Sequence, residues 1–351
     1  MTTDPTSPAH RQGLRPLRVA VIAPISWRTP PRHYGPWELF ASLLTEGLVS
    51  LGHDVTLFAT ADSITTATLR ATAAHGWSDD PTIDAKVAEC LHIASVFECA
   101  DDFDVIHNSF DFLPLTYSDL VATPVVTTVH GFSSEQILPV YERYDASTTY
   151  VAISDANRHP RLHYAATIHH GIRTSEFRVH CSPRDHLLFF GRIHPDKGTA
   201  QAIELARRTG RTLVIAGIVQ DERYFTTEVL PHVDGAVVQY IGPVAAADRA
   251  DVLGSAGALV HLIDFEEPFG YSVVEAMACG TPVIAFDRGS MREIIDHGVT
   301  GYVVGDLDHA EQSVQTMGDL DRDVIRRSAV ERFDQMRMVR EYVDVYRQLI
   351  S

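Results

Sequence analysis

"FEEPFGYSVVEAMACGTPVIA", from Phe265 to Ala285, is the most informative stretch of the chain. The apolar run that leads into it, ALVHLIDF, is typical of a buried strand. Pro-Phe-Gly predicts a tight turn, and the amphipathic residues after the turn predict a helix. This order explains the apolar and turn residues. It does not explain why two carboxylates, Glu267 and Glu275, frame the turn, so their placement points to a function.

Strand and helix patterns of the same kind extend toward the N-terminus. LRVAVIAP, residues 17–24, is rich in β-branched residues and is typical of a strand buried on both faces of a parallel sheet. The next helix is expected to begin at Pro36, a favourable first position, and to close at Gly52. Further strands of the first half are expected at 53–60, 104–109, 124–131, 148–154 and 165–171.

After a polar connector at about 175–185 the pattern starts again. A helix is expected at 198–210, and the last helix from about Val330 to Leu349. The strands of this half are expected at 186–193, 211–219, 237–244, 258–265, 281–287 and 301–305. Two successive doubly wound α/β domains fit the restart better than one barrel, which would need eight evenly repeated units.

These patterns predict the domain limits. A Rossmann-like N-terminal domain is expected at 17–178 and a second Rossmann-like domain at 179–329. Residues 330–351 are expected to form a C-terminal helix that packs back on the N-terminal domain. Residues 1–16 are polar and lack the apolar core of a signal peptide, so we expect a disordered lead-in.

Composition excludes several functional classes. The formal net charge of −17 argues against broad binding to nucleic acid or anionic lipid. No apolar run approaches the roughly 20 residues needed to cross a bilayer, so no integral membrane segment is expected. The scattered cysteines have no CxxC spacing and indicate reduced thiols in a cytoplasmic protein; they are Cys90, Cys99, Cys181 and Cys279. HExxH and GxSxG are missing, which argues against a metal site and a serine hydrolase.

FFGRIHPDKG, residues 189–198, carries two cations directly after an expected strand. The guanidinium of Arg192 can form two parallel hydrogen bonds to phosphate oxygens, and Lys197 adds a positive charge on a flexible side chain. Loops at the carboxyl ends of parallel strands are where ligands bind in open sheets, so this pair is a candidate phosphate clamp. The alternative is an exposed loop with ordinary surface charges.

The two glutamates of the opening stretch suit a sugar or a nucleotide. Glu267 ends a strand beside a helix N-terminus, whose free N–H groups favour a phosphate or a sugar hydroxyl. Glu275 lies among apolar residues, where an unpaired carboxylate is costly, and could accept two hydrogen bonds from a vicinal diol. In the alternative interpretation, Glu267 only caps the helix electrostatically and Glu275 is an exposed helical residue.

The first half offers polar residues in several strand-end loops, each weak by itself. Lone histidines are more often structural than catalytic, which applies to most of the 18 histidines of the chain. The candidates in these loops are Gly35, Glu38, His107, His130, Ser154, Arg158, His169 and His170.

Taken together these motifs resemble a known family. EPFGYSVVE resembles the paired glutamates, seven residues between them, of retaining GT-B glycosyltransferases, specifically glycosyltransferase family four. GRIHPDKG is similar to the GRxxxxKG of that family. PPRHYGPWE, VHG, AIS…R, HHGI…F, VIAG, YIGPV and ACGTPVIA…G…E follow the family's usual order. The resemblance extends from Arg18 to the last helix, and it implies two Rossmann-like domains that face each other across a cleft.

The resemblance also implies roles for single residues. Arg192 and Lys197 would bind the donor diphosphate, Glu275 the ribose hydroxyls, and Glu267 with Phe269, Gly270 and Tyr271 the transferred sugar. His130 would lie over the reacting sugar, and Gly35 would approach the phosphates. Two positions depart from the family pattern: Pro36-Trp37 follow Gly35 where a second glycine is usual, and His170 replaces an asparagine before glycine.

The expected activity is therefore that of a retaining glycosyltransferase with the acceptor on the N-terminal domain and the nucleotide sugar on the C-terminal one. GDP-mannose is favoured as donor ahead of UDP-glucose, the acceptor is a sugar or another small molecule, and neither metal nor cofactor is expected. A GT-B-shaped sugar phosphorylase or nucleotide-sugar epimerase is one alternative. A nucleotide-sugar-binding protein without catalytic activity is the other.

Overall fold

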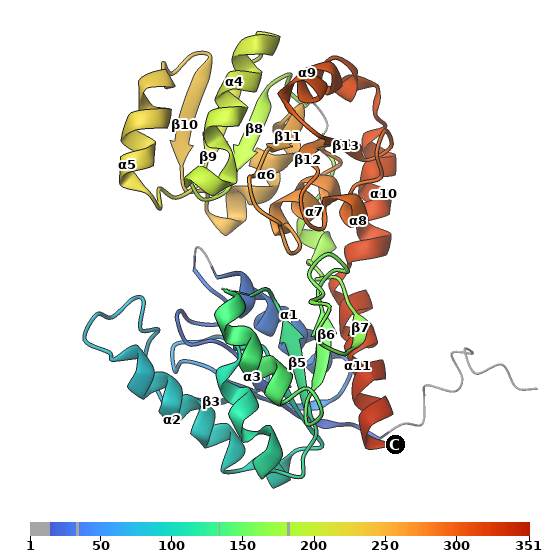
Figure 1. Ribbon diagram of the computed structural model, residues 1–351. Helices are drawn as coiled ribbons and strands as arrows, with labels where there is room; N and C mark the ends of the chain where they lie inside the picture. The colour runs from blue at the N-terminus through green and yellow to red at the C-terminus, as the bar shows by residue number, and fades with distance from the viewer. Residues whose placement is uncertain (1–14, 33–34, 133, 181–182) are drawn as a thin grey trace, which may run out of the picture.

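The computed structural model describes residues 15–32, 35–132, 134–180 and 183–351 and has two lobes, one above the other (Figure 1). Each lobe is built around its own sheet, and the chain crosses between them near residue 172 and again near residue 334. Residues 1–14 of the expected lead-in and Cys181 lie outside the described residues.

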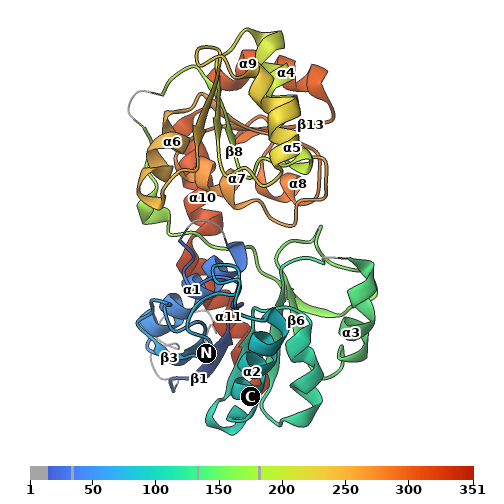
Figure 2. The same cartoon turned by 90° about the vertical axis from the view of Figure 1, so that its left-hand side faces the viewer.

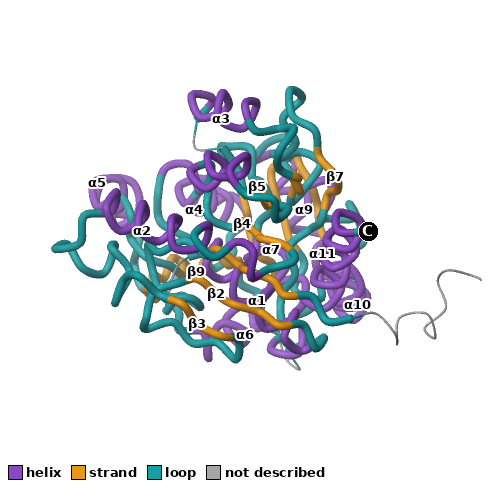
Figure 3. Tube along the Cα trace, turned by 90° about the horizontal axis from the view of Figure 1, so that it is seen from below, coloured by secondary structure: helices purple, strands orange, loops and turns teal. Residues whose placement is uncertain are grey.

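Within the described residues, the lower lobe holds a parallel sheet in the order β3-β2-β1-β4-β5-β6-β7. Its strands are β1 Arg18–Ile22, β2 Asp54–Phe58, β3 Thr68–Arg70, β4 Val105–Asn108, β5 Val125–Val129, β6 Thr149–Ala152 and β7 Tyr164–Thr167. Its helices are α1 Pro36–Ser50, α2 Ala85–Phe97 and α3 Leu138–Arg143. Side chains alternate along β1: Val19 and Val21 face α1, whereas Ala20 and Ile22 face α2. Both faces of the sheet are therefore covered (Figure 3).

The described residues of the upper lobe form a parallel sheet in the order β10-β9-β8-β11-β12-β13. Its strands are β8 Leu187–Phe190, β9 Leu213–Ala216, β10 Val238–Gly242, β11 Ala258–His261, β12 Val283–Phe286 and β13 Gly301–Val304. Its helices are α4 Thr199–Thr209, α5 Glu222–Tyr224, α6 Arg249–Ser255, α7 Tyr271–Ala278, α8 Met291–Ile294, α9 Leu307–Thr316 and α10 Arg322–Phe333. Leu188 packs toward α7 and α10, while Leu187 and Phe189 pack toward α4 and α9. The two parallel sheets confirm the predicted fold class.

The last helix differs from the prediction of a single helix from Val330 to Leu349. Two helices, α10 and α11 (Gln335–Ile350), are separated at Asp334, whose backbone is extended. The Asp334 carboxylate accepts a hydrogen bond from the Met336 N–H at 2.9 Å and so caps α11. Ile172 bonds to the backbone on both sides of the break, at Phe333 O (2.8 Å) and Gln335 N (2.9 Å). The break thus lies where the two crossing segments meet.

Helix α11 packs on the lower lobe, as Figures 1 and 2 show. A Cβ atom at Gly47 of α1 would come within 2.4 Å of Val339, so only glycine permits this approach of the two helices. The Tyr346 hydroxyl bonds to His107 Nδ1 at 2.7 Å, and the Tyr342 hydroxyl to Thr128 Oγ1 at 2.8 Å. Burial lowers the pKa of His107 to about 3, so this neutral imidazole anchors the C-terminal helix.

The structure also shows the state of the cysteines and the character of the helices in the described residues. Cys90, Cys99 and Cys279 are free thiols. None of the helices in the described part of the chain combines the length and apolar character needed to span a bilayer.

Candidate active site in the cleft between the lobes

A cleft of about 1010 Å³ lies between the two lobes. It is lined by loops that follow the carboxyl ends of β5 and β7 below and of β8, β9 and β11 above, which is where ligands bind in open parallel sheets. The site residues expected from the sequence all line this cleft: Gly35, His130, Arg192, Lys197, Glu267, Phe269, Gly270, Tyr271 and Glu275.

The turn between β11 and α7 presents the start of that helix to the cleft. Gly270 has a left-handed backbone with φ of 89°, a conformation that favours glycine, and α7 begins directly after it. Ser290 fixes the turn: its N–H donates to Glu267 O at 2.9 Å and its hydroxyl to Phe269 O at 3.0 Å. Because the first N–H groups of a helix have no intrahelical acceptor, this end of α7 can receive an anion or a hydroxyl.

The Glu267 carboxylate is contacted by nitrogen atoms of two side chains. Lys197 Nζ lies 3.0 Å from Glu267 Oε2, and His261 Nε2 lies 3.5 Å from the same oxygen. Burial by itself would raise the pKa of Glu267, but the contact with His261 and the charge of Lys197 outweigh burial and lower the pKa to about 2. Glu267 is therefore a carboxylate at any physiological pH.

The loop after β8 reaches Glu267 because it packs on the end of β11. Asp196 O accepts a hydrogen bond from Asp264 N at 2.9 Å. Gly198 has φ of 76°, and a Cβ there would lie 1.9 Å from Leu262 O. This close approach carries Lys197 into the cleft, where its side chain is only 16% exposed and Nζ lies 4.3 Å from the centre of the Phe265 ring.

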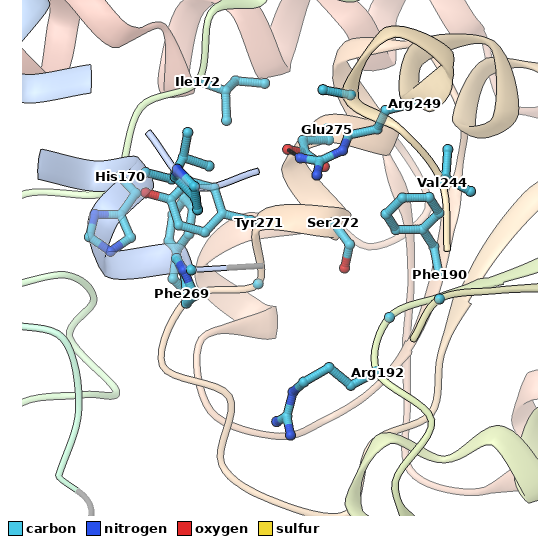
Figure 4. Close-up of a pocket in the computed structure, with 18 of the residues that line it drawn as sticks. His170, Ile172, Phe190, Arg192, Val244, Arg249, Phe269, Tyr271, Ser272 and Glu275 are labelled. Atoms are coloured by element: carbon cyan, nitrogen blue, oxygen red, sulfur yellow. Dashed lines mark hydrogen bonds and ion pairs between the residues drawn. The ribbon is translucent and has the colours of Figure 1, made fainter. Parts of the chain in front are cut away.

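Arg192 lies across the cleft from α7. Its side chain is 18% exposed, so neither cation of this loop is an ordinary surface charge. The guanidinium donates to Gln220 Oε1 and has Asp196 at 4.0 Å. In the view of Figure 4, the Ser272 side chain lies between Arg192 and the Glu275 carboxylate.

Glu275 is buried in the wall of the cleft and is not an exposed helical residue. Arg249 Nη1 donates to Glu275 Oε1 at 2.8 Å, and Figure 4 shows the two side chains facing each other. Burial raises the pKa of Glu275, although the charge of Arg249 opposes that shift. The carboxylate that the sequence left without a partner is therefore ion-paired.

Aromatic rings of the lower lobe stack on one another and on Tyr271 of α7 where the two lobes meet. Trp37 stacks on His130 with ring centres 5.2 Å apart, and His170 stacks on Tyr271 at 5.1 Å. His130 Nδ1 and His170 Nε2 are 3.4 Å apart, so the two imidazoles form a pair. Burial lowers the pKa of His130 to about 3 and that of His170 well below its ordinary value, so both are neutral near pH 7.

Three buried polar atoms of this stack have no hydrogen-bond partner within the described residues. They are His130 Nε2, His170 Nδ1 and the Tyr271 hydroxyl oxygen. Buried polar groups are nearly always hydrogen-bonded, and all three residues line the cleft. Hydroxyls of a bound sugar are suitable partners for them.

Gly35 marks the entrance to α1. A Cβ atom there would approach Glu38 Oε2 to 2.7 Å and Pro31 Cβ to 2.9 Å. Its φ of 154° is also unfavourable for other residues. Pro36 and Trp37, which replace the second glycine of the family motif, both line the cleft.

Other sequence candidates lie outside the described cleft lining. The Ser154 hydroxyl donates to Pro268 O at 2.7 Å and so joins the lobes, while Arg158 lies over the Tyr164 ring at 5.1 Å. His169 pairs with Glu293 at 3.1 Å. Glu293 also accepts from the backbone N–H groups of residues 155 and 156, at 2.8 and 2.7 Å, and makes a second connection between the lobes.

Sequence reasoning missed Arg249, Ser272 and Phe190, all of which line the cleft. Arg249 begins α6, in the segment that follows β10, so the rule about strand ends would have found it. Ser272 is one residue past the turn that drew attention to Glu267. Phe190 gave no signal, because an aromatic residue at a strand end is usually part of the core.

A protein-family model matches the upper lobe. Residues 176–323 match the family model described as "Glycosyl transferases group 1". One curated relative is the N-acetyl-alpha-D-glucosaminyl L-malate synthase of Bacillus anthracis, 38% identical over 96 residues. The matched segment covers 25% of this chain and only a quarter of that relative's length.

Solved structures match over nearly the whole chain. AviGT4, a glycosyltransferase involved in avilamycin A biosynthesis, has a TM-score of 0.71 and 25% identity, with 95% of this chain and 98% of that chain covered. HepE of Anabaena, solved in complex with UDP and glucose, has a TM-score of 0.72 and 18% identity, with 94% and 99% covered. These matches confirm the predicted GT-B fold.

Proposed function

We propose that this chain, which belongs to the glycosyl transferases group 1 family through residues 176–323, moves a hexose from a nucleotide sugar to a carbohydrate or other small-molecule acceptor with retention of configuration. GDP-mannose is the first donor to test and UDP-glucose the second. In this proposal the upper lobe is the nucleotide-sugar domain and the lower lobe is the acceptor domain. The single observation that carries it is the cleft, which combines cations, a helix N-terminus and unpartnered buried polar atoms.

The donor diphosphate is assigned to Arg192, Lys197 and the start of α7. Both cations line the cleft, and neither is an exposed surface charge. As the bond to the sugar breaks, negative charge grows on the leaving diphosphate, and fixed cations and dipoles stabilise that charge. A lysine ammonium has three N–H donors on a flexible stem, so Lys197 can divide its hydrogen bonds between Glu267 and a phosphate oxygen.

Glu267 is assigned to hydroxyls of the transferred sugar and Glu275 to the ribose. An ionised Glu267 accepts hydrogen bonds and favours the positive charge that develops on the sugar. Glu275 uses Oε1 for Arg249, which leaves Oε2 for a ribose hydroxyl. His130 and His170 are neutral, so they serve as hydrogen-bond partners of sugar hydroxyls and not as acids.

Retention is proposed because the described cleft offers poor bases for inversion. Inverting attack needs a base opposite the leaving group whose pKa is near neutrality. Each carboxylate that lines the described cleft has a cation nearby: Glu176 has Arg173 at 3.4 Å, Glu267 has Lys197, and Glu275 has Arg249. Attack from the face of the departing diphosphate, which itself takes the acceptor proton, needs no such residue.

The decisive test is donor turnover by the purified chain. GDP-mannose, UDP-glucose and other nucleotide sugars are incubated with a panel of acceptors, and nucleoside diphosphate release is measured with Glu267→Gln as the matched control. The proposal expects turnover with one donor and an α-linked product from an α-linked donor, seen by NMR of the anomeric proton. A product of opposite configuration would contradict retention.

The same assay separates the alternatives. A phosphorylase would consume inorganic phosphate or release sugar 1-phosphate. An epimerase would convert the donor to its isomer without an acceptor. A binding protein would take up the nucleotide in calorimetry and release no diphosphate with any donor.

A further inference from the structure

A second cavity, of about 400 Å³, opens in the lower lobe beside the cleft. The two hollows share Pro36 and Trp37, the residues at the start of α1. The second cavity is otherwise walled by the loops after β1 and β4, by α2 and by the segment before α2. Trp37 also stacks on His130, so a group bound here is one ring away from the cleft.

All tryptophans of the chain line this cavity. The chain contains three, Trp27, Trp37 and Trp77, although they are up to 50 residues apart in sequence. Indole faces attract cations and the C–H faces of sugar rings. The Trp77 Nε1–H is buried and makes no hydrogen bond of ordinary geometry within the described residues. Glu89 lies close to this indole, which acts on the carboxyl as a hydrogen-bond donor and partly offsets the rise in the pKa of Glu89 that burial causes.

Three carboxyl groups face the same cavity: Glu38, Glu89 and Asp111. Glu89 and Asp111 interact electrostatically, which shows that they are neighbours. Their partners in the described residues are neutral, such as the Tyr141 hydroxyl at 3.2 Å from Asp111 and the Trp27 backbone for Glu38. No lysine, arginine or histidine is among the cavity's lining residues in the described chain.

We propose that this cavity is an acceptor subsite for an amine-bearing sugar or cyclitol, whose ammonium group lies among the three carboxylates and whose ring lies on the indoles. The assignment rests on the proposed transferase function, and it adds the chemical class of the acceptor. An acceptor that carries a phosphate at this position would meet three carboxylates and no cation. A neutral acceptor would gain the indole contacts alone. The charge of the cavity therefore selects for a cation.

All three tryptophans line this cavity, and Trp27 and Trp77 do not line the cleft, so intrinsic fluorescence reports occupancy of the cavity without donor or turnover. D-Glucosamine, N-acetyl-D-glucosamine and D-glucosamine 6-phosphate form a matched series of probes: cationic, neutral and phosphate-bearing. We expect D-glucosamine to quench fluorescence with at least ten-fold tighter affinity than N-acetyl-D-glucosamine, and D-glucosamine 6-phosphate to bind more weakly than D-glucosamine.

Glu89→Gln should reduce the preference for D-glucosamine over N-acetyl-D-glucosamine to about three-fold or less. The control is Glu98→Gln, which removes one exposed charge at the end of the same helix and should keep the wild-type preference. Glu38→Gln, at a second wall, provides an independent variant. Equal affinities for the three probes, or an unchanged preference in Glu89→Gln and Glu38→Gln, would overturn the subsite.

Donor turnover in the same preparation distinguishes the two proposals. Turnover of a nucleotide sugar without selective glucosamine binding overturns the subsite and leaves the transferase intact. Selective glucosamine binding without turnover of any donor overturns the transferase function, and with it the role of the cavity as an acceptor site.

Discussion

The carboxylates of the two hollows have opposite environments, although the hollows adjoin. In the described residues of the cleft, Glu176, Glu267 and Glu275 each have an arginine or lysine within 4.0 Å. In the second cavity, Glu38, Glu89 and Asp111 interact with hydroxyl, indole and backbone groups. The carboxylates of the cleft thus have cationic partners, which at Glu267 lower the pKa to about 2, whereas the carboxyl groups of the second cavity have neutral partners and raised pKa values.

The different environments of these carboxylates match the ligands proposed for the two hollows, a diphosphate in the cleft and a cation in the second cavity. The upper wall supplies cations that its own carboxylates already neutralise in part, so an incoming diphosphate shares Lys197 with Glu267. The second cavity holds one buried carboxyl group, Glu38, and two partly buried ones, Glu89 and Asp111, whose pKa values burial raises. A cation is the partner that would lower these pKa values again. The predictions below test this contrast, from the largest effect to the smallest.

Lys197→Ala should have the largest effect. It removes a charge-assisted contact to phosphate, typically worth about 1.5–3 kcal/mol, and leaves the buried Glu267 carboxylate without its cation, which typically costs about 3–5 kcal/mol of stability. We expect kcat/KM to fall by at least about ten-fold and the free energy of unfolding to drop. The chain has one other lysine, Lys86, and Lys86→Ala is the matched control. Wild-type kinetics in Lys197→Ala would refute the phosphate assignment.

Glu38→Gln and Glu267→Gln should change stability with opposite signs. Burial raises the pKa of Glu38 from 4.5 to about 7, so its ionisation favours the unfolded state. The cost is absent below pH 4.5, grows as the pH rises toward 7, and is constant above it. Removing it in Glu38→Gln should stabilise the fold by about 3 kcal/mol at pH 8 and by little at pH 4.5.

For Glu267 the pKa is lowered from 4.5 to about 2, so the ionised form stabilises the fold above pH 4.5 and this contribution is lost as the pH falls toward 2. Glu267→Gln should therefore destabilise the protein by about 3 kcal/mol at pH 8. Urea unfolding of both variants at several pH values measures the two curves. Curves of the same sign would refute the contrast between the two hollows.

The glutamates that frame the turn should divide substrate binding between them. Glu275→Gln should weaken binding of the bare nucleoside diphosphate by about 1.5–3 kcal/mol, because the ribose is present without the sugar. Glu267→Gln should leave that binding nearly intact and reduce turnover of the full donor. Calorimetry with the bare diphosphate is compared with kinetics with the full donor. Thermal melts measure any loss of stability that results from leaving Arg249 without its carboxylate partner. Equal loss of diphosphate affinity in both variants would contradict the division.

The sequence predicted the fold well because its signals are local. Apolar runs and turn residues located both sheets. The strand-end rule located Gly35, His130, Arg192, Lys197 and Glu267, whereas Glu275 drew attention as a carboxylate among apolar residues of a helix. The family resemblance added Phe269, Gly270 and Tyr271.

The sequence did not show the pairing of Glu275 on α7 with Arg249 on α6, because these helices meet only through tertiary packing. Nor did it show that the turn after β11 brings Glu267 back to His261 at the end of that strand. The break at Asp334 was missed because the apolar spacing continues from α10 into α11, and only the contact with Ile172 explains the extended residue.

The smallest effect expected is that of chelation, which should leave turnover unchanged. In glycosyltransferases that neutralise the diphosphate with a metal ion, grouped carboxylates hold that ion, whereas Arg192, Lys197 and the start of α7 are assigned that task here. Within the described part of the chain no three histidine, cysteine, aspartate or glutamate side chains are grouped to hold a metal. Turnover in excess EDTA should match turnover in buffer, with Lys197→Ala as the reference for a weakened clamp. Loss of activity on chelation, restored by a divalent cation, would show that a metal neutralises the diphosphate. It would refute the assignment of that role to the cations of the cleft, on which the comparison of the two hollows depends.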